Sequence, residues 1–94
     1  MIVKWLDRAV KDLQVLRDYI AQDKNVAAGR VAKKILYAVN MLSKQPEIGR
    51  HGRVAHTREL IIPGTLYIVP YRVKDNKVEI LRVFHCAMQW PEEF

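Results

Sequence analysis

The chain has 94 residues, of which half are apolar, and sixteen basic against ten acidic side chains give it a formal net charge of +6. This length predicts one domain over residues 1–94 with a thin core, and no apolar stretch approaches the roughly 20 residues that a membrane-spanning helix requires. The single cysteine excludes an internal disulfide, and the early polar turn at Asp7 excludes a signal peptide. We therefore expect a reduced, cytoplasmic protein whose basic charge favours an acidic partner.

Two helices are predicted after a short opening strand at residues 2–5. The first begins at Asp7, whose carboxylate can accept the free N–H groups of the first turn. Its apolar face repeats every three or four residues, at Ala9, Leu13, Leu16 and Ile20. The second helix is expected over 25–43, with apolar positions at the same spacing: Val31, Ile35, Val39 and Leu42. The connection at 22–24 is short, so the helices should form an antiparallel hairpin, and several alanines allow close approach: Ala27, Ala28, Ala32 and Ala38.

Three strands are predicted after Pro46, which ends the second helix. Residues 47–53 form an irregular basic loop, after which the apolar period falls to two over 57–62, 65–73 and 77–85. Pro63-Gly64 and the run 74–76 supply the turns between these strands. Pro70 removes one donor from the middle strand, which predicts a bulge or a sheet edge there. The layout is β-α-α-β-β-β, an α+β domain with the helical hairpin packed on one face of a small antiparallel sheet.

Side-chain alternation predicts that both faces of this sheet are largely apolar. In the middle strand, one face carries Tyr67, Val69, Tyr71 and Val73, and the opposite face carries Leu66, Ile68, Pro70 and Arg72. In the last strand, the alternation groups Val78, Ile80, Arg82 and Phe84. The hairpin can cover only one face, so we expect the other to be an open docking groove on which Arg72 and Arg82 stand. The alternative is an ordinary solvated sheet in which these arginines pair with Glu59 and Glu79.

Few residues could carry chemistry. The histidines at 51, 56 and 85 have no metal-ligand spacing, and the sequence has no glycine-rich phosphate loop or nucleophile elbow, so we expect no metal and no cofactor. Metal-independent RNA cleavage remains, with His85 as acid or base, Glu59 or His56 as a second proton-transfer group, and three arginines to stabilise the phosphorane: Arg58, Arg72 and Arg82. A purely structural role is the alternative for His85.

Other conspicuous side chains have plainer interpretations. Five aromatic residues supply aromatic surface, and most of them are interpreted as core: Trp5, Tyr37, Tyr67, Tyr71 and Trp90. Trp90 is expected to anchor the C-terminal tail. The cations of the second helix are interpreted as its solvated face or, alternatively, as a partner contact: Arg30, Lys33 and Lys34.

Motifs along the whole chain resemble one known family. They are Trp5, Ala9, Asp12-Leu13, Tyr19-Ile20-Ala21, Ala27-Ala28, Pro46, Gly49, Arg58-Glu59-Leu60, Tyr67-Ile68-Val69, Tyr71-Arg72-Val73 and the run 78–85. Their order and spacing are similar to those of the RelE/ParE toxin superfamily of type II toxin–antitoxin systems. The resemblance implies a growth-inhibiting toxin from a chromosomal or plasmid stability module. It also implies a cognate antitoxin whose C-terminal segment wraps around the toxin in a hetero-oligomer, and contact with operator DNA only through that antitoxin.

Two branches of this superfamily differ in their target, since RelE-like members cut mRNA in the ribosomal A site and ParE-like members poison DNA gyrase. The RelE-like branch has an arginine where this chain has Ile68, another that matches Ala87, and a catalytic tyrosine whose hydroxyl Phe94 cannot supply. The run His85-Cys86-Ala87-Met88 instead resembles a histidine–x–x–methionine ending of ParE-like toxins, although Gln89 stands where those often have an acidic residue. Other nuclease branches use a histidine near the position of His85.

The resemblance therefore favours a ParE-like toxin that inhibits growth by poisoning DNA gyrase and has no catalytic site. One alternative is a RelE-like, ribosome-dependent mRNA endonuclease with these candidate catalytic residues: His85, Arg72, Arg82, Glu59 and His56. A non-toxic module that only binds the antitoxin is a third possibility. For contact with the target or the antitoxin, we predict the open sheet face and the helical hairpin, with these residues on the contact surface: Arg58, Leu66, Ile68, Arg72, Arg82, Phe84, His85 and Trp90.

Overall fold

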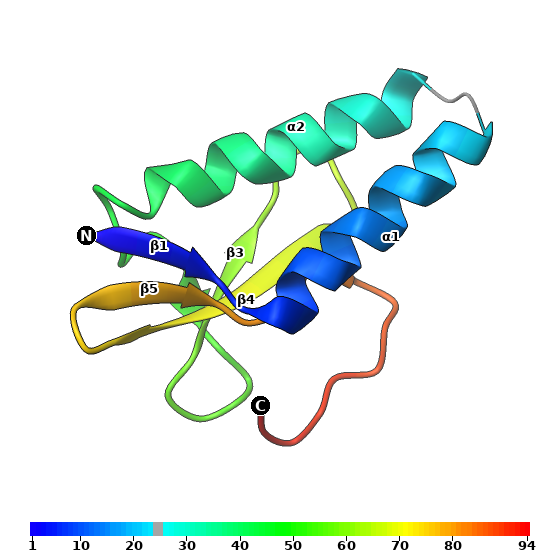
Figure 1. Ribbon diagram of the computed structural model, residues 1–94. Helices are drawn as coiled ribbons and strands as arrows, with labels where there is room; N and C mark the ends of the chain where they lie inside the picture. The colour runs from blue at the N-terminus through cyan, green and yellow to red at the C-terminus, as the bar shows by residue number, and fades with distance from the viewer. Residues whose placement is uncertain (24–25) are drawn as a thin grey trace.

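Two helices and six strands make up the described part of the chain, residues 1–23 and 26–94 of a computed structural model. In chain order they are β1 (Ile2–Trp5), α1 (Asp7–Asp23), α2 (Val26–Met41), β2 (Arg50–His51), β3 (Arg58–Ile61), β4 (Tyr67–Lys74), β5 (Lys77–Ile80) and β6 (Phe84–His85). The predicted α+β layout is confirmed, and both helices lie on one side of the sheet (Figure 1). Neither helix is long and apolar enough, over the described residues, to cross a membrane.

The helical hairpin follows the predicted pattern. α1 begins at Asp7, and α2 ends at Met41, two residues before the predicted end at 43. Gln22, expected in the connection, lies within α1. Lys24 and Asn25 lie outside the described residues, and so do three side chains of the predicted contact: Ile20, Ala27 and Ala28. The core-facing residues of the two helices share one buried cluster: Ala9, Leu13, Leu16, Ala32, Ile35, Val39 and Leu42.

The sheet is mixed rather than antiparallel. Its strand order is β1-β5-β4-β3-β2, with β6 beside β4. β1 runs parallel to β5, and the other neighbours are antiparallel. The expectation of an antiparallel sheet is therefore wrong at β1. A parallel pair needs a long connection between its strands, and the hairpin together with β2–β4 provides one.

The last predicted strand is interrupted opposite Pro70. The ladder between β4 and β5 ends at the pair Tyr71–Ile80, and it resumes between β4 and β6 at the pair Ile68–Phe84. Three residues between 80 and 84 therefore face two residues between 68 and 71. Because proline has no N–H to donate into this ladder, the extra residue is the bulge that the sequence predicts.

The bulge reverses the alternation of side chains. Residues paired across two strands share a face, so Phe84 lies on the face of Ile68. Ile80 pairs with Tyr71 and lies on the opposite face, which the helices cover. The prediction that Phe84 shares a face with Ile80 is wrong, because one extra residue shifts a period-two pattern to the other side of the sheet.

The core between the hairpin and the sheet is tied to the loop after α2 by Tyr71. The sheet contributes a compact apolar set to this core: Leu60, Ile62, Val69, Tyr71, Val78, Ile80 and Val83. The Tyr71 hydroxyl donates to Pro46 O at 2.7 Å and accepts from Gly49 N at 2.9 Å. Burial raises the pKa of Tyr71 above its ordinary value, so the phenol stays neutral and holds the loop against the sheet.

Candidate functional site

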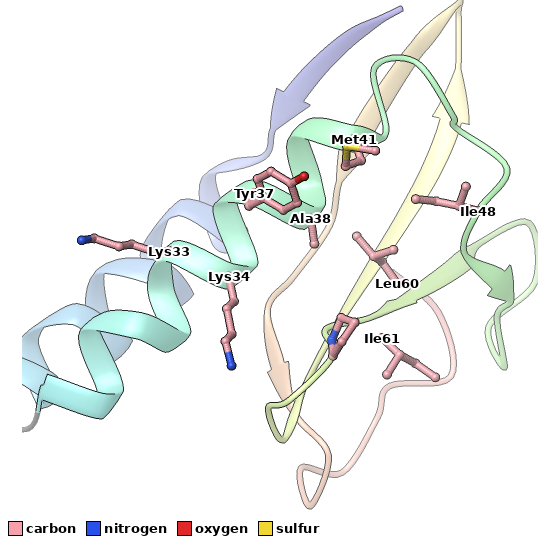
Figure 2. A pocket seen from close by; sticks show the side chains of 9 residues that line it. Lys33, Lys34, Tyr37, Ala38, Met41, Ile48, Leu60 and Ile61 are labelled. Atoms are coloured by element: carbon pink, nitrogen blue, oxygen red, sulfur yellow. The ribbon is translucent and has the colours of Figure 1, made fainter.

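An apolar groove of about 580 Å³ runs between α2 and β3. Tyr37, Ala38 and Met41 of α2 lie across from Leu60 and Ile61 of β3 (Figure 2). Large apolar side chains are accessible here, since Tyr37 is 72% exposed and Ile61 is 49% exposed. The remaining lining residues are Lys33, Lys34, Ile48 and Pro63.

The groove arises from a second apolar stripe on α2, which the sequence interpretation missed. Tyr37, Ala38 and Met41 recur at helical spacing beside the buried positions 35, 39 and 42, and the charged Lys34 continues the same row. Tyr37 is one of the aromatic residues that do not belong to the core, and this spacing was the signal that could have shown it. Lys33 and Lys34, named from the sequence as a solvated face or a partner contact, lie toward the N-terminal end of α2 at one end of the groove (Figure 2).

His85 lies in a second cleft, of about 710 Å³, between α1 and the end of the sheet formed by β4 and β6. Its ring meets Tyr67 edge-on with 5.5 Å between ring centroids, and its Nδ1 accepts a hydrogen bond from Ala87 N at 3.1 Å. Leu66 is exposed and lines the same cleft. Two of the predicted contact residues, Leu66 and His85, are thus brought together here.

Arg72 and Arg82 are not free cations on an open face. Arg72 Nε donates to Glu79 Oε1 at 2.7 Å, as the alternative interpretation held. Arg82 instead binds Asp12 of α1 through two hydrogen bonds of 2.7 and 3.0 Å, and not Glu59. The hydrogen bond with Asp12 raises the pKa of Arg82 above its ordinary value. Arg82 therefore fixes the bulged segment after β5 to the helical hairpin.

Glu59 is a buried, ionised anchor. Its carboxylate accepts hydrogen bonds from Arg50 Nη2 at 2.8 Å, Arg53 Nε at 3.1 Å and Arg53 N at 2.7 Å. Burial by itself would raise the pKa of Glu59, but the hydrogen bonds from Arg53 and Arg50 outweigh it and hold the pKa below its ordinary value. Because both oxygens are occupied, Glu59 is poorly placed to exchange a proton with a substrate, and it fastens the loop after β2 instead.

The C-terminal tail covers part of the sheet face opposite the helices, so the expected groove is not open at Phe84. Phe84 is only 2% exposed and contacts Trp90 and Phe94 of the C-terminal tail, with 5.1 and 6.2 Å between ring centroids. Arg53 lies over the Trp90 ring at 3.9 Å. Trp90 thus anchors the tail as predicted. The C-terminal tail runs on the side of the sheet away from the helices (Figure 1). The bulge causes this closure, because it turns Phe84 toward the tail.

The residues of the nuclease alternative are not gathered at one point. His85 pairs with Tyr67, and Arg72 lies five positions further along β4, roughly 16 Å along the strand. An odd number of positions also puts them on opposite faces of the sheet. One cavity of about 420 Å³ has four basic residues in its lining: His51, His56, Arg58 and Arg72. The role of the predicted contact residues in binding a target or an antitoxin stays a prediction.

The potential metal-binding side chains of the described residues do not form a metal centre. Over residues 1–23 and 26–94, no group of three or more His, Cys, Asp or Glu side chains could hold a metal ion.

The sequence matches the family model described as the ParE toxin of the type II toxin–antitoxin system, parDE, over residues 3–90. The protein Y4kP of Sinorhizobium fredii, which is named as a toxin, is 42% identical over 90 residues, covering 96% of this chain and 93% of the relative. Toxin RelE2 of Caulobacter vibrioides is 40% identical over 85 residues, covering 90% of this chain and 94% of the relative. These similarities extend over nearly the whole chain.

Solved structures agree with the sequence matches. A chain of the chromosomal ParDE toxin–antitoxin system of P. aeruginosa superposes with a TM-score of 0.77 at 26% identity, covering 90% of this chain and 95% of that chain. A chain of the toxin–antitoxin complex RelBE2 of Mycobacterium tuberculosis superposes with a TM-score of 0.65 at 27% identity, covering 89% of this chain and 95% of that chain.

Proposed function

Because this chain belongs to the ParE toxin family of type II toxin–antitoxin systems, we propose that it inhibits growth by poisoning DNA gyrase in the cytoplasm. A cognate antitoxin holds it inactive in a hetero-oligomer and provides the contact with operator DNA. The observation that carries this proposal is the match of the ParE family model to residues 3–90.

The positions of the basic side chains support binding rather than catalysis. RNA cleavage without a metal needs an acid, a base and a cation around one phosphate. His85 and Arg72 lie on opposite faces of the sheet, and Arg82 and Glu59 are engaged in ion pairs. In this proposal, these side chains maintain the fold or contact partners, and none of them transfers a proton.

A supercoiling assay with toxin released from its antitoxin tests the proposal. Purified gyrase should lose supercoiling activity or accumulate cleaved DNA as toxin is added, and stoichiometric antitoxin should restore supercoiling. A translation reaction with the same preparation should leave its mRNA intact. Unaffected gyrase together with cut mRNA would instead support the RelE-like alternative. The similarity to a relative named toxin RelE2 favours that alternative. His85→Gln should then abolish cleavage while antitoxin binding persists. Unimpaired growth upon expression without antitoxin would point to a non-toxic module.

The antitoxin is proposed to occupy the groove between α2 and β3. Tyr37, Met41 and Ile61 expose apolar surface along this groove, which suits an amphipathic helix laid against it. Lys33 and Lys34 at one end favour acidic residues on the bound segment. Around Phe84, the sheet face opposite the helices offers little apolar surface, since the C-terminal tail already occupies that part of the face.

Calorimetric titration of the toxin with its antitoxin tests this site. Tyr37→Glu and Ile61→Glu each remove an exposed apolar contact and add a charge that repels an acidic segment. Losing about 1.5–3 kcal/mol of apolar burial should weaken binding by at least about tenfold. Val10→Glu is the matched control, because Val10 is an exposed apolar residue of α1 that does not line the groove. Equal affinity of Tyr37→Glu, Ile61→Glu and wild type would exclude the groove as the antitoxin site.

A further inference from the structure

A polar cavity of about 420 Å³ lies beside the loop that joins β2 to β3. Its wall consists of residues 51, 52 and 54–58, and of Arg72 and Val73 of β4. Two histidines and two arginines are among the residues that line this space, and none of the lining residues, all of which the structure describes, is acidic. The gyrase proposal does not use this cavity, and neither does the antitoxin groove.

The wall of the cavity is a pre-formed loop. Gly52 N donates to Thr57 O at 2.8 Å, and Thr57 Oγ1 donates to Val54 O at 2.7 Å. Val54 and Thr57 are buried, and a Cβ on Gly52 would lie 2.2 Å from Thr57 Oγ1. At the other side of the loop, the backbone N–H of Arg53 is bound by the buried carboxylate of Glu59. A loop fixed at both ends can hold donors in position before a ligand arrives.

His56 occupies a costly backbone conformation in this loop. Its φ of 63° lies in the left-handed region, which non-glycine residues seldom adopt. Asn, Asp and His are the side chains that tolerate this region best, and such strain persists where the surroundings impose it, often at binding sites. His51 and His56 are exposed, and within the described part of the chain neither side chain makes a hydrogen bond. Their ring nitrogens are therefore available to a ligand.

Arg58 and Arg72 supply fixed positive charge. Arg58 Nη1 donates to the backbone oxygens of Gly49 at 2.8 Å and Glu47 at 3.3 Å. Within residues 1–23 and 26–94, no carboxylate forms an ion pair with Arg58, so its position is fixed while its charge is not neutralised. Arg72 binds Glu79 through Nε, which leaves its two Nη groups to donate to an anion.

We propose that this cavity binds a backbone phosphate of duplex DNA. Phosphate oxygens in protein–DNA complexes are bound by arginine, by short polar side chains and by backbone N–H groups, and such contacts position a protein without reading sequence. The cavity is larger than one phosphate and can admit the adjoining sugar, and the net charge of +6 favours association with a polyanion. The inference rests on the proposed function in one respect: gyrase acts on duplex DNA, so a toxin that poisons it meets this ligand at its target.

Fluorescence anisotropy with a labelled duplex oligonucleotide tests the cavity without gyrase. Arg72→Gln should weaken binding several-fold and flatten the slope of log affinity against log salt by about 0.9, the value for one lost phosphate contact. The double variant Arg72→Gln/Glu79→Gln keeps the net charge of the wild type and should show the same loss. His56→Asn, which tolerates the left-handed conformation, should weaken binding as well. Lys11→Gln removes an exposed charge from α1 and should leave the slope nearly unchanged.

Several outcomes would overturn the inference. The inference fails if Arg72→Gln and His56→Asn bind the duplex as tightly as wild type. It also fails if Lys11→Gln loses as much duplex affinity as these two variants. Weakened binding of an acidic peptide with unchanged binding of the duplex would assign the cavity to a protein carboxylate instead. If the cavity variants lose DNA binding while wild type leaves gyrase unaffected, the inference stands and the gyrase proposal fails. If wild type inhibits gyrase without any measurable duplex binding, the gyrase proposal stands and the inference of a DNA phosphate site fails.

Discussion

Replacing Glu59 by Gln tests whether a buried carboxylate holds the loop between β2 and β3. The side chain is 1% exposed, and its oxygens accept five hydrogen bonds of 2.7–3.3 Å from Arg50 and Arg53. Gln keeps the shape but replaces one oxygen by an NH₂ group, a donor that would face donors. Breaking a fully buried pair costs about 3–5 kcal/mol. Here both guanidinium groups are about half exposed and can be rehydrated, so we expect a loss of about 2–3 kcal/mol in the free energy of unfolding.

Thermal unfolding followed by circular dichroism measures this loss. In a domain of this size, about 1 kcal/mol changes Tm by roughly 4–8 °C, so Glu59→Gln should lower Tm by roughly 8–24 °C. Glu79→Gln is the matched control, because it removes the same charge from a more accessible pair with Arg72 and should cost at most about 1 kcal/mol. Equal losses in the two variants would refute the reasoning that burial gives the Glu59 cluster its importance.

The same variant predicts a pH dependence. The hydrogen bonds from Arg53 and Arg50, acting against burial, hold the pKa of Glu59 below its ordinary value of 4.5. The stabilisation is therefore fully present above the unfolded pKa and is lost as the pH falls through the folded pKa. Gln does not titrate, so the difference in Tm between wild type and Glu59→Gln should narrow on acidification through this range. A difference that stays constant in acid would contradict the assignment of the effect to the ionised carboxylate.

Three further predictions concern single contacts. Tyr71→Phe removes a buried hydroxyl with two backbone hydrogen bonds and should lower the free energy of unfolding in urea by about 1–3 kcal/mol; an unchanged midpoint would mean that water replaces them. Gly52→Ala should destabilise through its clash with Thr57, whereas Gly29→Ala in α2, where an added Cβ meets no described atom within 4 Å, should stabilise by roughly 0.5–1 kcal/mol. Trp90→Phe removes a buried indole N–H that has no partner in the described residues and should leave Tm unchanged or raised, whereas Trp90→Ala should lower Tm by uncovering Phe84.

The order of the elements could be predicted from the sequence because local patterns determine it. Helical spacing indicates both helices. Asp75 and Asn76 indicate the turn at 74–76, and they adopt left-handed φ values of 51° and 61° there. The parallel pairing of β1 with β5 could not be predicted, because a strand's partner depends on packing between segments far apart in the chain. Pro70 predicted where the ladder breaks. It did not predict that the extra residue would turn Phe84 to the other face.

The candidate site was less predictable for the same reason. The pair Arg72–Glu79 spans two adjacent strands joined by a tight turn, so sequence proximity suggested it. Arg82 and Asp12 are 70 positions apart, and only the packing of α1 against the bulged segment brings them together. Tyr37 illustrates a different failure, because an apolar side chain on an amphipathic helix can belong to the core stripe or to a neighbouring one.

The distribution of charge separates residues that hold the fold from those available to partners. A net charge of +6 indicates an acidic partner but does not say where it binds. Arg50 and Arg53 share the single carboxylate of Glu59, which compensates half of their combined charge, and the charge of Arg82 is compensated by Asp12. Arg58 is held by neutral carbonyl oxygens and keeps its charge. Charge that the fold positions but does not neutralise can contribute to binding without a large desolvation cost to its own ion pair. The cavity beside Arg58 is therefore a better candidate for an anionic partner than Arg82, whose charge Asp12 compensates.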